Sequence, residues 1–400
     1  MTTTRSELQA RHAPRVLLLT SGYAPTIGGA ETYAQTLSEG LARSGCPVAV
    51  VTDRPPGTAP VPGDTDVRIH RLDGYRALLT DPSKLAWEQL YFGLLPELHE
   101  IVEAFRPEVV VVNNLETTVL GRIVAEQYGI GIVAAYHEHA PEEEPLGPGK
   151  EALGYRVLAP DLVLAGSEYY AQRARRHLPE HRVRLIHHGV ETEHFHPSVD
   201  GSAVRARYGV TAGERLIVSA GRLKARKGQR ELIHAFARLA DERSRLLIVG
   251  GVSSASPQYA QRLEADVDRL GLRGRIIIDR SVGYDQMPAV YAAADIVAQP
   301  SESEGLGLAV LEAMSTARPV VTTDVPGIRE ILTADGIAEC VPARDPVRLA
   351  GALARLLSDP PHAARVGEAA RRHVLEHFST DSMIRRSRAA IEEVVAGAPR

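Results

Sequence analysis

The sequence is poor in cysteine: only Cys46 and Cys340 occur among 400 residues, and these two lie far apart. Two distant cysteines form neither a zinc-ligand pair nor the disulfide framework of a small secreted protein. No uninterrupted apolar run approaches the ~20 residues that a membrane-spanning helix needs. The opening stretch MTTTRSELQARHAPR lacks the apolar centre of a secretion signal. We therefore expect a reduced, soluble cytoplasmic protein without stable membrane association.

The net charge of −4 is small, but the two halves of the chain differ in sign. Residues 1–200 carry 18 Lys and Arg against 26 Asp and Glu, whereas residues 201–400 carry 28 against 24. An acidic first half disfavours binding to nucleic acid or to anionic lipid. A mildly basic second half suits a polyanionic ligand such as a nucleotide diphosphate.

Short β-branched runs alternate with helix-length segments in both halves, a pattern typical of parallel sheets with crossover helices. The predicted strands are 15–20, 47–52, 108–113, 130–136, 162–165 and 182–187, then 215–220, 245–250, 275–278, 295–299, 320–323 and 338–341. We therefore predict an α/β fold with two Rossmann-like, doubly wound parallel-sheet domains. Ligands of open α/β sheets bind at the carboxyl edges of the strands, so we expect the domains to face each other across a cleft.

The predicted domain boundary lies near residue 200. The stretch from about Phe195 to Gly213 has no strong strand pattern and contains Pro197 and Gly201, so we place the interdomain linker there. Domains over 1–200 and 201–375 follow, with a helical C-terminal segment over 376–400.

The segment Ser301–Glu312 carries the sharpest functional pattern. Seven residues separate Glu304 from Glu312, and Gly305 and Gly307 stand between them at the predicted start of a helix. Glycines let backbone amides approach a ligand closely, and a helix N-terminus favours phosphate. Glu312 would lie roughly 7–8 Å along the helix, so the two carboxylates could hold hydroxyls at opposite ends of a nucleotide sugar. The alternative is a surface loop with an acidic residue that favours the helix dipole.

This segment resembles the retaining family 4 glycosyltransferases of the GT-B fold. In that family, a motif of two glutamates separated by seven residues follows a Pro-Ser turn, which is Pro300-Ser301 here. The continuation LEAMSTARPVVTTDVPGIREI also resembles the family, including the Gly327 to Glu330 turn. Thr316-Ala317-Arg318 stands where the family usually has a glycine. The resemblance covers nearly the whole chain and implies a nucleotide-sugar-dependent enzyme. It also implies that the second domain binds the donor, that the first binds the acceptor, and that the segment 376–400 crosses back to the first domain.

A basic loop follows the predicted strand 215–220. Arg222, Lys224, Arg226 and Lys227 lie within six positions, and cations at the carboxyl edge of a sheet can neutralise a diphosphate leaving group. The family pattern assigns the phosphate contacts to Arg222 and Lys227 and leaves Lys224 and Arg226 as rim charges or bystanders. A solvated basic turn is the alternative interpretation.

The resemblance completes the predicted site with residues of the first domain. Paired glycines between the first strand and the first helix would let the donor approach backbone amides, and a histidine after the strand 130–136 would lie beside the transferred sugar. The predicted catalytic residues are Glu304, Arg222, Lys227 and His137. The predicted donor-binding residues are Gly28, Gly29, Gly305, Leu306, Gly307, Leu308, Glu312, Arg280, Ser281 and Val282, and the predicted acceptor-side residues are His139, Glu142 and Glu143.

The cluster His137-Glu138-His139 offers zinc-type ligands, but no third ligand can be nominated beside the two histidines. We therefore predict no metal and no cofactor, with the nucleotide diphosphate sugar as co-substrate. The resemblance implies transfer of a hexose-type sugar, with retention, to a hydroxyl of a small-molecule acceptor. Because Glu142, Glu143 and Glu144 would repel lipid phosphates, we expect a soluble and preferably cationic acceptor, such as an aminosugar or a cyclitol.

Three alternatives stay open from the sequence. A nucleotide-sugar 2-epimerase of the same architecture would need a catalytic carboxylate set that cannot be placed. A glycosyltransferase could instead use a lipid or phosphorylated acceptor. A non-catalytic nucleotide-sugar-binding module would keep the basic loop and have no need for Glu304.

Overall fold

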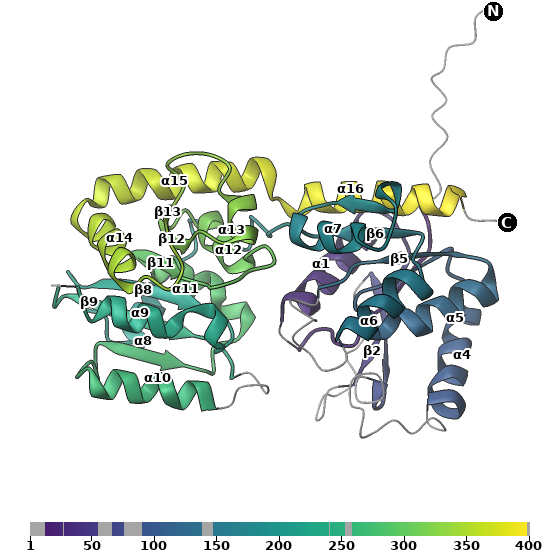
Figure 1. Cartoon of the computed structure of the whole chain (residues 1–400), viewed down its shortest axis with the longest axis horizontal. Coiled ribbons are helices and arrows are strands. Elements are labelled where there is room, and N and C mark those ends of the chain that lie inside the picture. The colour runs from purple at the N-terminus through teal and green to yellow at the C-terminus, as the bar shows by residue number, and fades with distance from the viewer. Residues whose placement is uncertain are drawn as a thin grey trace, which may run out of the picture. The chain divides into compact units, whose positions relative to one another are not determined.

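The computed structural model describes residues 13–26, 28–54, 66–75, 90–137, 147–239, 241–252 and 258–397. The chain divides into two compact units (Figure 1). The first unit comprises 1–166, 170–186 and 384–400, and the second comprises 167–169 and 187–383. The chain thus changes unit at 186/187, earlier than the boundary expected near 200, and returns at 383/384, later than the expected 375/376.

The first unit is built on a parallel sheet with the strand order β3-β2-β1-β4-β5-β6-β7. β1 and β4 are buried along their whole length, as expected when helices cover both faces of a sheet. The strands are β1 Val16–Leu19, β2 Val48–Asp53, β3 Val67–Leu72, β4 Val109–Val112, β5 Gly131–Ala134, β6 Leu162–Ala165 and β7 Val183–Leu185. The main helices are α1 Gly29–Arg43, α4 Leu95–Phe105, α5 Thr118–Tyr128, α6 Gly147–Ala152 and α7 Glu168–Arg175.

The second unit repeats this architecture with the strand order β10-β9-β8-β11-β12-β13, again all parallel. Its strands are β8 Arg215–Ala220, β9 Ser244–Val249, β10 Ile276–Asp279, β11 Ile296–Gln299, β12 Val320–Thr323 and β13 Glu339–Val341. Its helices are α8 Ser202–Arg207, α9 Gln229–Phe236, α10 Gln258–Arg269, α11 Met287–Ala293, α12 Leu308–Ser315, α13 Pro326–Ile331, α14 Pro346–Ser358 and α15 Pro360–His377. The predicted fold class is confirmed.

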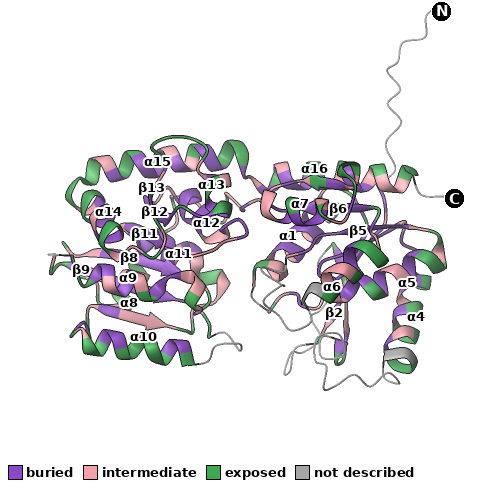
Figure 2. Ribbon diagram, viewed as in Figure 1, coloured by how far each residue is buried: buried purple, intermediate pink, exposed green. Residues whose placement is uncertain are grey.

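Buried residues concentrate in the strands and on the helix faces that cover them (Figure 2). In the second unit they form two apolar clusters that share the sheet. One contains Phe236 and Leu353, and the other contains Phe195 and Met314. Phe195 is fully buried and its carbonyl accepts a hydrogen bond from Ser315 Oγ at 2.7 Å. The stretch expected to be a linker therefore begins as part of the second core.

One strand, β3, lies outside the predicted set. It is the edge strand of the first sheet, and its sequence VRIHRL interrupts the apolar residues with charged ones. Charged side chains are common on edge strands because they discourage pairing with other chains. Because of these charges, the strand lacks the apolar run by which the other strands are predicted from the sequence.

The last three helices of the chain are α14, α15 and α16, and α16, over Thr380–Gly397, makes up most of the predicted C-terminal segment 376–400. Asp359 breaks the first two helices apart, because its carboxylate accepts a hydrogen bond from His362 N at 2.9 Å and Pro360 follows it. Most of α16 belongs to the first unit. A Cβ on Gly40 would lie 2.4 Å from Ile384 Cδ1, and one on Gly131 would lie 2.4 Å from Val394 Cγ1. These two glycines let α16 pack closely against the first unit.

Candidate functional site

The strand order of the second sheet reverses direction between its adjacent strands β8 and β11. Ligands of doubly wound sheets bind at such a switch point, beyond the carboxyl ends of the strands. The loops that leave these two strands are 221–228 and 300–307, which contain the predicted basic loop and the predicted Glu304 segment. Gly228 lets them meet. Its φ is +67°, and a Cβ there would lie 1.9 Å from the Pro300 carbonyl oxygen.

Glu304 is the centre of this meeting point. Its Oε1 lies 2.5 Å from Lys227 Nζ and 2.6 Å from Ser301 Oγ, and its side chain is only 11% exposed. Burial alone would raise the pKa of the Glu304 carboxyl, but the Lys227 ammonium and the hydrogen bonds from Lys227 and Ser301 outweigh it. The pKa therefore lies below its usual value, and the carboxylate stays ionised.

Arg226, which the family pattern leaves as a rim charge or bystander for the phosphates, links the two loops. Its guanidinium donates to the Ser303 carbonyl at 3.1 Å and lies 3.8 Å from Glu304 Oε2. The Arg226 carbonyl in turn accepts a hydrogen bond from Glu302 N at 2.8 Å. The loops 221–228 and 300–307 are thus joined through both the backbone and the side chain of Arg226.

Gly307 starts α12 from a left-handed conformation, with φ +97°. A Cβ there would lie 2.6 Å from Ile328 Cδ1. Glycine therefore permits both the left-handed backbone conformation and the close contact with Ile328. Among the described residues, no side chain caps this helix. The first amides of a helix lack intrahelical acceptors and carry partial positive charge, so Gly305, Leu306, Gly307 and Leu308 lead into an N-terminus suited to a phosphate group.

Glu312 lies inside α12 and is buried, with 8% of its surface exposed. Its Oε2 accepts a hydrogen bond from Tyr291 at 2.8 Å, and its Oε1 accepts one from Tyr284 at 3.3 Å. Burial raises the pKa of Glu312 to about 7, although both tyrosines and Lys227 oppose the rise. Glu304 and Glu312 therefore lie near the same cation with opposite tendencies toward protonation.

The other predicted residues of the second unit lie at strand ends without joining this cluster. Arg222 follows β8 and is exposed. Arg280 pairs with Glu264, and Ser281 Oγ donates to Asp279 at 2.6 Å. Val282 packs against the apolar cluster of Phe195. Their roles in phosphate and base binding stay predictions.

In the first unit the switch point lies between β1 and β4. Gly28 is extended (φ 174°) and immediately precedes α1, which begins at Gly29. A Cβ on Gly28 would lie 2.1 Å from Glu31 Oε2, so the absence of a side chain there makes room for the folded-back Glu31. The predicted contact of this loop with the donor stays a prediction.

His137 follows β5 and belongs to a hydrogen-bonded network. Asn113 Nδ2 donates to the Ala30 carbonyl at 2.9 Å, and Asn113 Oδ1 lies 3.0 Å from His137 Nε2. Because a carbonyl oxygen can only accept, the Asn113 amide must present its oxygen to His137. Neutral His137 therefore carries its proton on Nε2. Its backbone carbonyl accepts from Tyr170 at 3.2 Å, and its ring lies 4.6 Å from that of Tyr33.

Comparison with known proteins places this site in a family. Residues 27–194 match the family described as Glycosyltransferase Family 4, and residues 202–373 match the one described as Glycosyl transferases group 1. The chain is 30% identical over 407 aligned residues to a D-inositol 3-phosphate glycosyltransferase of Segniliparus rotundus, with 92% of this chain and 87% of that protein covered. The chain belongs to glycosyltransferase family 4.

Further relatives of this family 4 enzyme span most of its length. A D-inositol 3-phosphate glycosyltransferase of Xylanimonas cellulosilytica is 29% identical, covering 90% of this chain and 92% of that protein. An alpha-maltose-1-phosphate synthase of Mycolicibacterium smegmatis is 28% identical, covering 78% and 87%. The chain is thus a nucleotide-sugar glycosyltransferase, as the sequence predicts.

Solved structures share the GT-B fold of this family 4 enzyme. The sucrose-phosphate synthase of Thermosynechococcus elongatus has a TM-score of 0.81 at 22% identity, covering 96% of this chain and 99% of that one. Anabaena HepE in complex with UDP-glucose has a TM-score of 0.79 at 20% identity, covering 96% and 99%.

Several features of the family 4 enzyme were not found from the sequence. The predicted acceptor-side residues His139, Glu142 and Glu143 lie outside the described residues. Ser301, Tyr284 and Tyr291 bond the two motif carboxylates without having been predicted. The two tyrosines carry no local sequence signal, because they reach Glu312 from 28 and 21 positions away in the chain.

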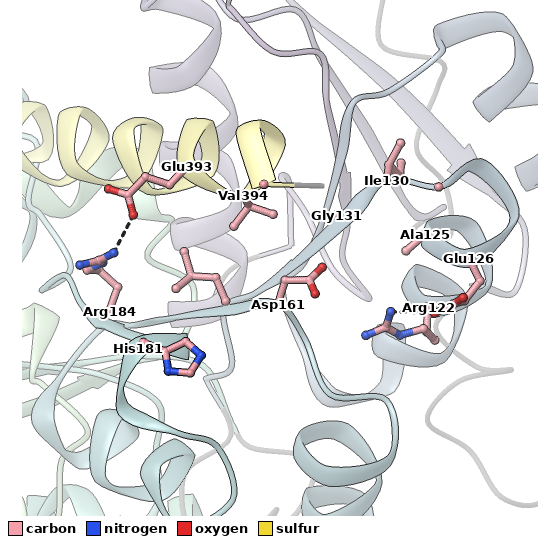
Figure 3. Close-up of a pocket in the computed structure, with 13 residues that line it drawn as sticks. Arg122, Ala125, Glu126, Ile130, Gly131, Asp161, His181, Arg184, Glu393 and Val394 are labelled. Carbon is pink, nitrogen blue, oxygen red and sulfur yellow. Dashed lines mark hydrogen bonds and ion pairs between the residues drawn. The ribbon is translucent and has the colours of Figure 1, made fainter. Parts of the chain in front are cut away.

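A cavity away from the switch points offers no better site for the family 4 enzyme. A cavity of about 390 Å³ lies in the first unit at the amino ends of β5 and β6 (Figure 3). Two of the cations that line it are already engaged: Arg122 donates to Leu158 O at 2.9 Å, and Arg184 bonds Glu393 at 2.7 Å. Within the described ranges no group of three His, Cys, Asp or Glu could hold a metal ion, and none of the helices has the length and apolar character of a membrane span.

Proposed function

We propose that this glycosyltransferase moves a hexose-type sugar, with retention of anomeric configuration, from a nucleotide diphosphate sugar to a hydroxyl of a small cyclitol-class acceptor. One observation carries the donor part of the proposal. A buried, ionised Glu304 is held by Lys227 at 2.5 Å in the loop that leads into the α12 N-terminus. Carboxylate, ammonium and helix amides supply what a sugar hydroxyl and a diphosphate require.

Lys227 can serve both partners. An ammonium has three donor hydrogens, so Lys227 can keep its bond to Glu304 while it donates to a phosphate oxygen. Arg222 and the amides of 305–308 add further positive potential. As the glycosidic bond breaks, charge grows on the diphosphate, and groups that already point at it stabilise the transition state without reorganising.

The acceptor hydroxyl is the nucleophile in this proposal. Its oxygen bonds to the anomeric carbon on the face from which the diphosphate leaves, and the departing phosphate oxygen takes the hydroxyl proton. Retention follows without a covalent enzyme intermediate. Glu304 orients the sugar hydroxyls, Glu312 holds the ribose, and the His137 ring and carbonyl stabilise the positive charge that develops on the sugar.

Two observations bear on the acceptor. Relatives named for D-inositol 3-phosphate favour a cyclitol. In the first unit, however, two cations are already paired with carboxylates. Lys150 bonds Glu116 at 3.3 Å, and Arg173 bonds Glu151 at 3.4 Å. Together with the acidic run at 142–144, this pairing favours an uncharged or amine-bearing cyclitol over a phosphorylated one.

The test begins with UDP-, GDP- and ADP-sugars, scored by thermal shift and by slow hydrolysis. The active donor is then offered to inositol, an aminocyclitol and inositol 3-phosphate, and the anomeric configuration of the product is read by NMR. We expect a retained configuration and transfer to the aminocyclitol or inositol. An inverted product, an epimerised donor, or exclusive use of inositol 3-phosphate would contradict the corresponding part of the proposal.

A further inference from the structure

Glu330, near the C-terminal end of α13, is bonded to donors from two distant parts of the chain. Its carboxylate accepts hydrogen bonds from Glu168 N at 2.7 Å and from Tyr169 N at 3.4 Å. It also lies 3.2 Å from His187 Nε2. The Glu330 side chain is 14% exposed, so these contacts are largely shielded from water.

The partners of Glu330 lie where the chain passes between its two units. Residues 167–169 form a short excursion into the second unit, and His187 is the first residue after the main change of unit. Glu168 and Tyr169 also begin α7, whose later residues belong to the first unit. A carboxylate is favoured at a helix N-terminus, so the positive end of the α7 dipole attracts the Glu330 carboxylate.

The other end of α13 lies against the donor loop. A Cβ on Gly327 would lie 2.5 Å from the Glu304 carbonyl oxygen and 2.7 Å from the Gly305 carbonyl carbon. Ile328 in turn packs over Gly307, where a Cβ would lie 2.6 Å from its Cδ1. A helix of only six residues therefore contacts the Glu304 loop at one end and the crossing segments at the other.

We propose that α13 couples the donor loop to the segments that connect the two units, and that Glu330 is a positioning residue for sugar transfer. The inference rests on the proposed function, in which donor contacts belong to the second unit and acceptor contacts to the first. Glu330 touches neither substrate. It fixes the connecting segments relative to the loop that holds the donor, so its loss misplaces the acceptor without weakening donor binding.

Two substitutions of Glu330 remove different numbers of its three hydrogen bonds. A carboxylate only accepts, so His187 must donate its Nε2 proton to Glu330. Glu330→Gln keeps one acceptor oxygen for the backbone amides but loses the charge, whereas Glu330→Ala removes every bond. Glu339→Ala is a matched control in the same unit, because Glu339 is a half-buried carboxylate bonded to Arg355 at 2.6 Å, on β13.

The experiment separates donor binding from transfer. In Glu330→Ala we expect the kcat of transfer to fall by about 10²-fold, the scale of a small misplacement of reactants. The Kd of UDP, or of GDP if the wild type prefers it, should stay near the wild-type value, as should slow donor hydrolysis. Glu330→Gln should recover part of the kcat, and Glu339→Ala should resemble the wild type. An unchanged kcat in Glu330→Ala, or a parallel loss of nucleotide binding, would overturn the proposal.

Amide hydrogen exchange supplies a readout that needs no turnover. The amides of Glu168 and Tyr169 should exchange faster in Glu330→Ala, while that of Arg348, capped by Asp345 at 2.9 Å, should not change. Unaltered exchange at 168 and 169 would overturn the role of Glu330. A wild-type chain that transfers to no acceptor would instead count against the proposed function, and the exchange result would still decide this inference.

Discussion

Two carboxylates of one motif have opposite environments in this enzyme. Glu304 bonds an ammonium and a hydroxyl, which lower its pKa despite burial. Glu312 bonds two tyrosine hydroxyls, which fail to offset burial, and its pKa rises to about 7. Groups with pKa values pushed apart in this way are typical of functional sites. The two positions therefore respond differently to substitution and to pH.

Substitution of Glu304 tests the role of the charge. Glu304→Gln keeps the shape of the side chain but removes the partner of Lys227 and the acceptor for sugar hydroxyls. We expect turnover to fall by about 10²–10³-fold, as for loss of one preorganised contact, with the fold intact. Turnover and melting temperature should be measured together, with Glu302→Gln as the control, since Glu302 bonds Arg344 at the rim. Near-normal turnover in folded Glu304→Gln would remove the residue from the site.

The raised pKa of Glu312 predicts a pH dependence of stability. Below about pH 4.5 the carboxyl is protonated in both the folded and unfolded states. Between about 4.5 and 7 the folded state keeps a proton that the unfolded state releases, so the free energy of unfolding falls as pH rises, by about 3 kcal/mol at most. Above about 7 the contribution is constant.

Denaturant titrations at about pH 5 and about pH 8, on the wild type and on Glu312→Gln, measure this effect. The wild type should lose more stability than the variant between these values. Tyr291→Phe should raise the Glu312 pKa further and extend the loss to higher pH, because the Tyr291 hydroxyl stabilises the ionised form. An identical pH dependence in wild type and Glu312→Gln would assign the carboxyl an ordinary pKa.

At the scale of elements, the approach of two loops depends on one glycine. Gly228 has φ +67° and lies against the Pro300 carbonyl, so Gly228→Ala adds a contact with backbone to a strained conformation. Gly336 has φ +74°, and a Cβ there would meet no described atom within 4 Å apart from its chain neighbours. Gly336→Ala therefore isolates the backbone strain from the contact.

We expect Gly336→Ala to cost about 1–2 kcal/mol of stability, the usual penalty for a left-handed alanine, and to leave nucleotide affinity unchanged. Gly228→Ala should cost more and should also weaken nucleotide binding, because the Lys227 loop must move away from Pro300 and Glu304. Denaturation and calorimetric titration with UDP or GDP measure the two effects. Equal nucleotide affinity in both variants would show that the close approach at Gly228 does not position Lys227.

Most elements could be predicted from the sequence because their signal is local. Buried parallel strands are apolar runs, and Leu162–Ala165, Arg215–Ala220 and Val320–Thr323 have the predicted bounds. The charged edge strand β3 lacked that signal. The same limit applies to the site: Glu304 and Lys227 belong to recognisable motifs, whereas Asn113 and Tyr291 matter through contacts with residues more than 20 positions away. Such pairings depend on topology, which periodicity does not report.

At the scale of the whole molecule, the absence of a nominated ligand set predicts activity without a metal. The diphosphate charge would be met by Arg222, Lys227 and helix amides instead of a divalent ion. We expect transfer to survive dialysis against EDTA, with the rate compared before and after addition of Mg²⁺ or Mn²⁺. Full loss on dialysis with rescue by either ion would contradict this prediction and would direct attention to the segment around His137.

The packing of α16 against the first unit has a consequence for the biosynthesis of the protein. Domains generally fold in the order in which they leave the ribosome. Here, however, Ile384 and Ile391, which are buried in the first unit, are made only after the whole second unit. Until they emerge, the surfaces around Gly40 and Gly131 stay uncovered. The second unit, whose residues end at 383, has its whole chain available earlier. We therefore expect the order of maturation to run against the order of synthesis, with the first unit completing its core only after the residues beyond 383 have been made.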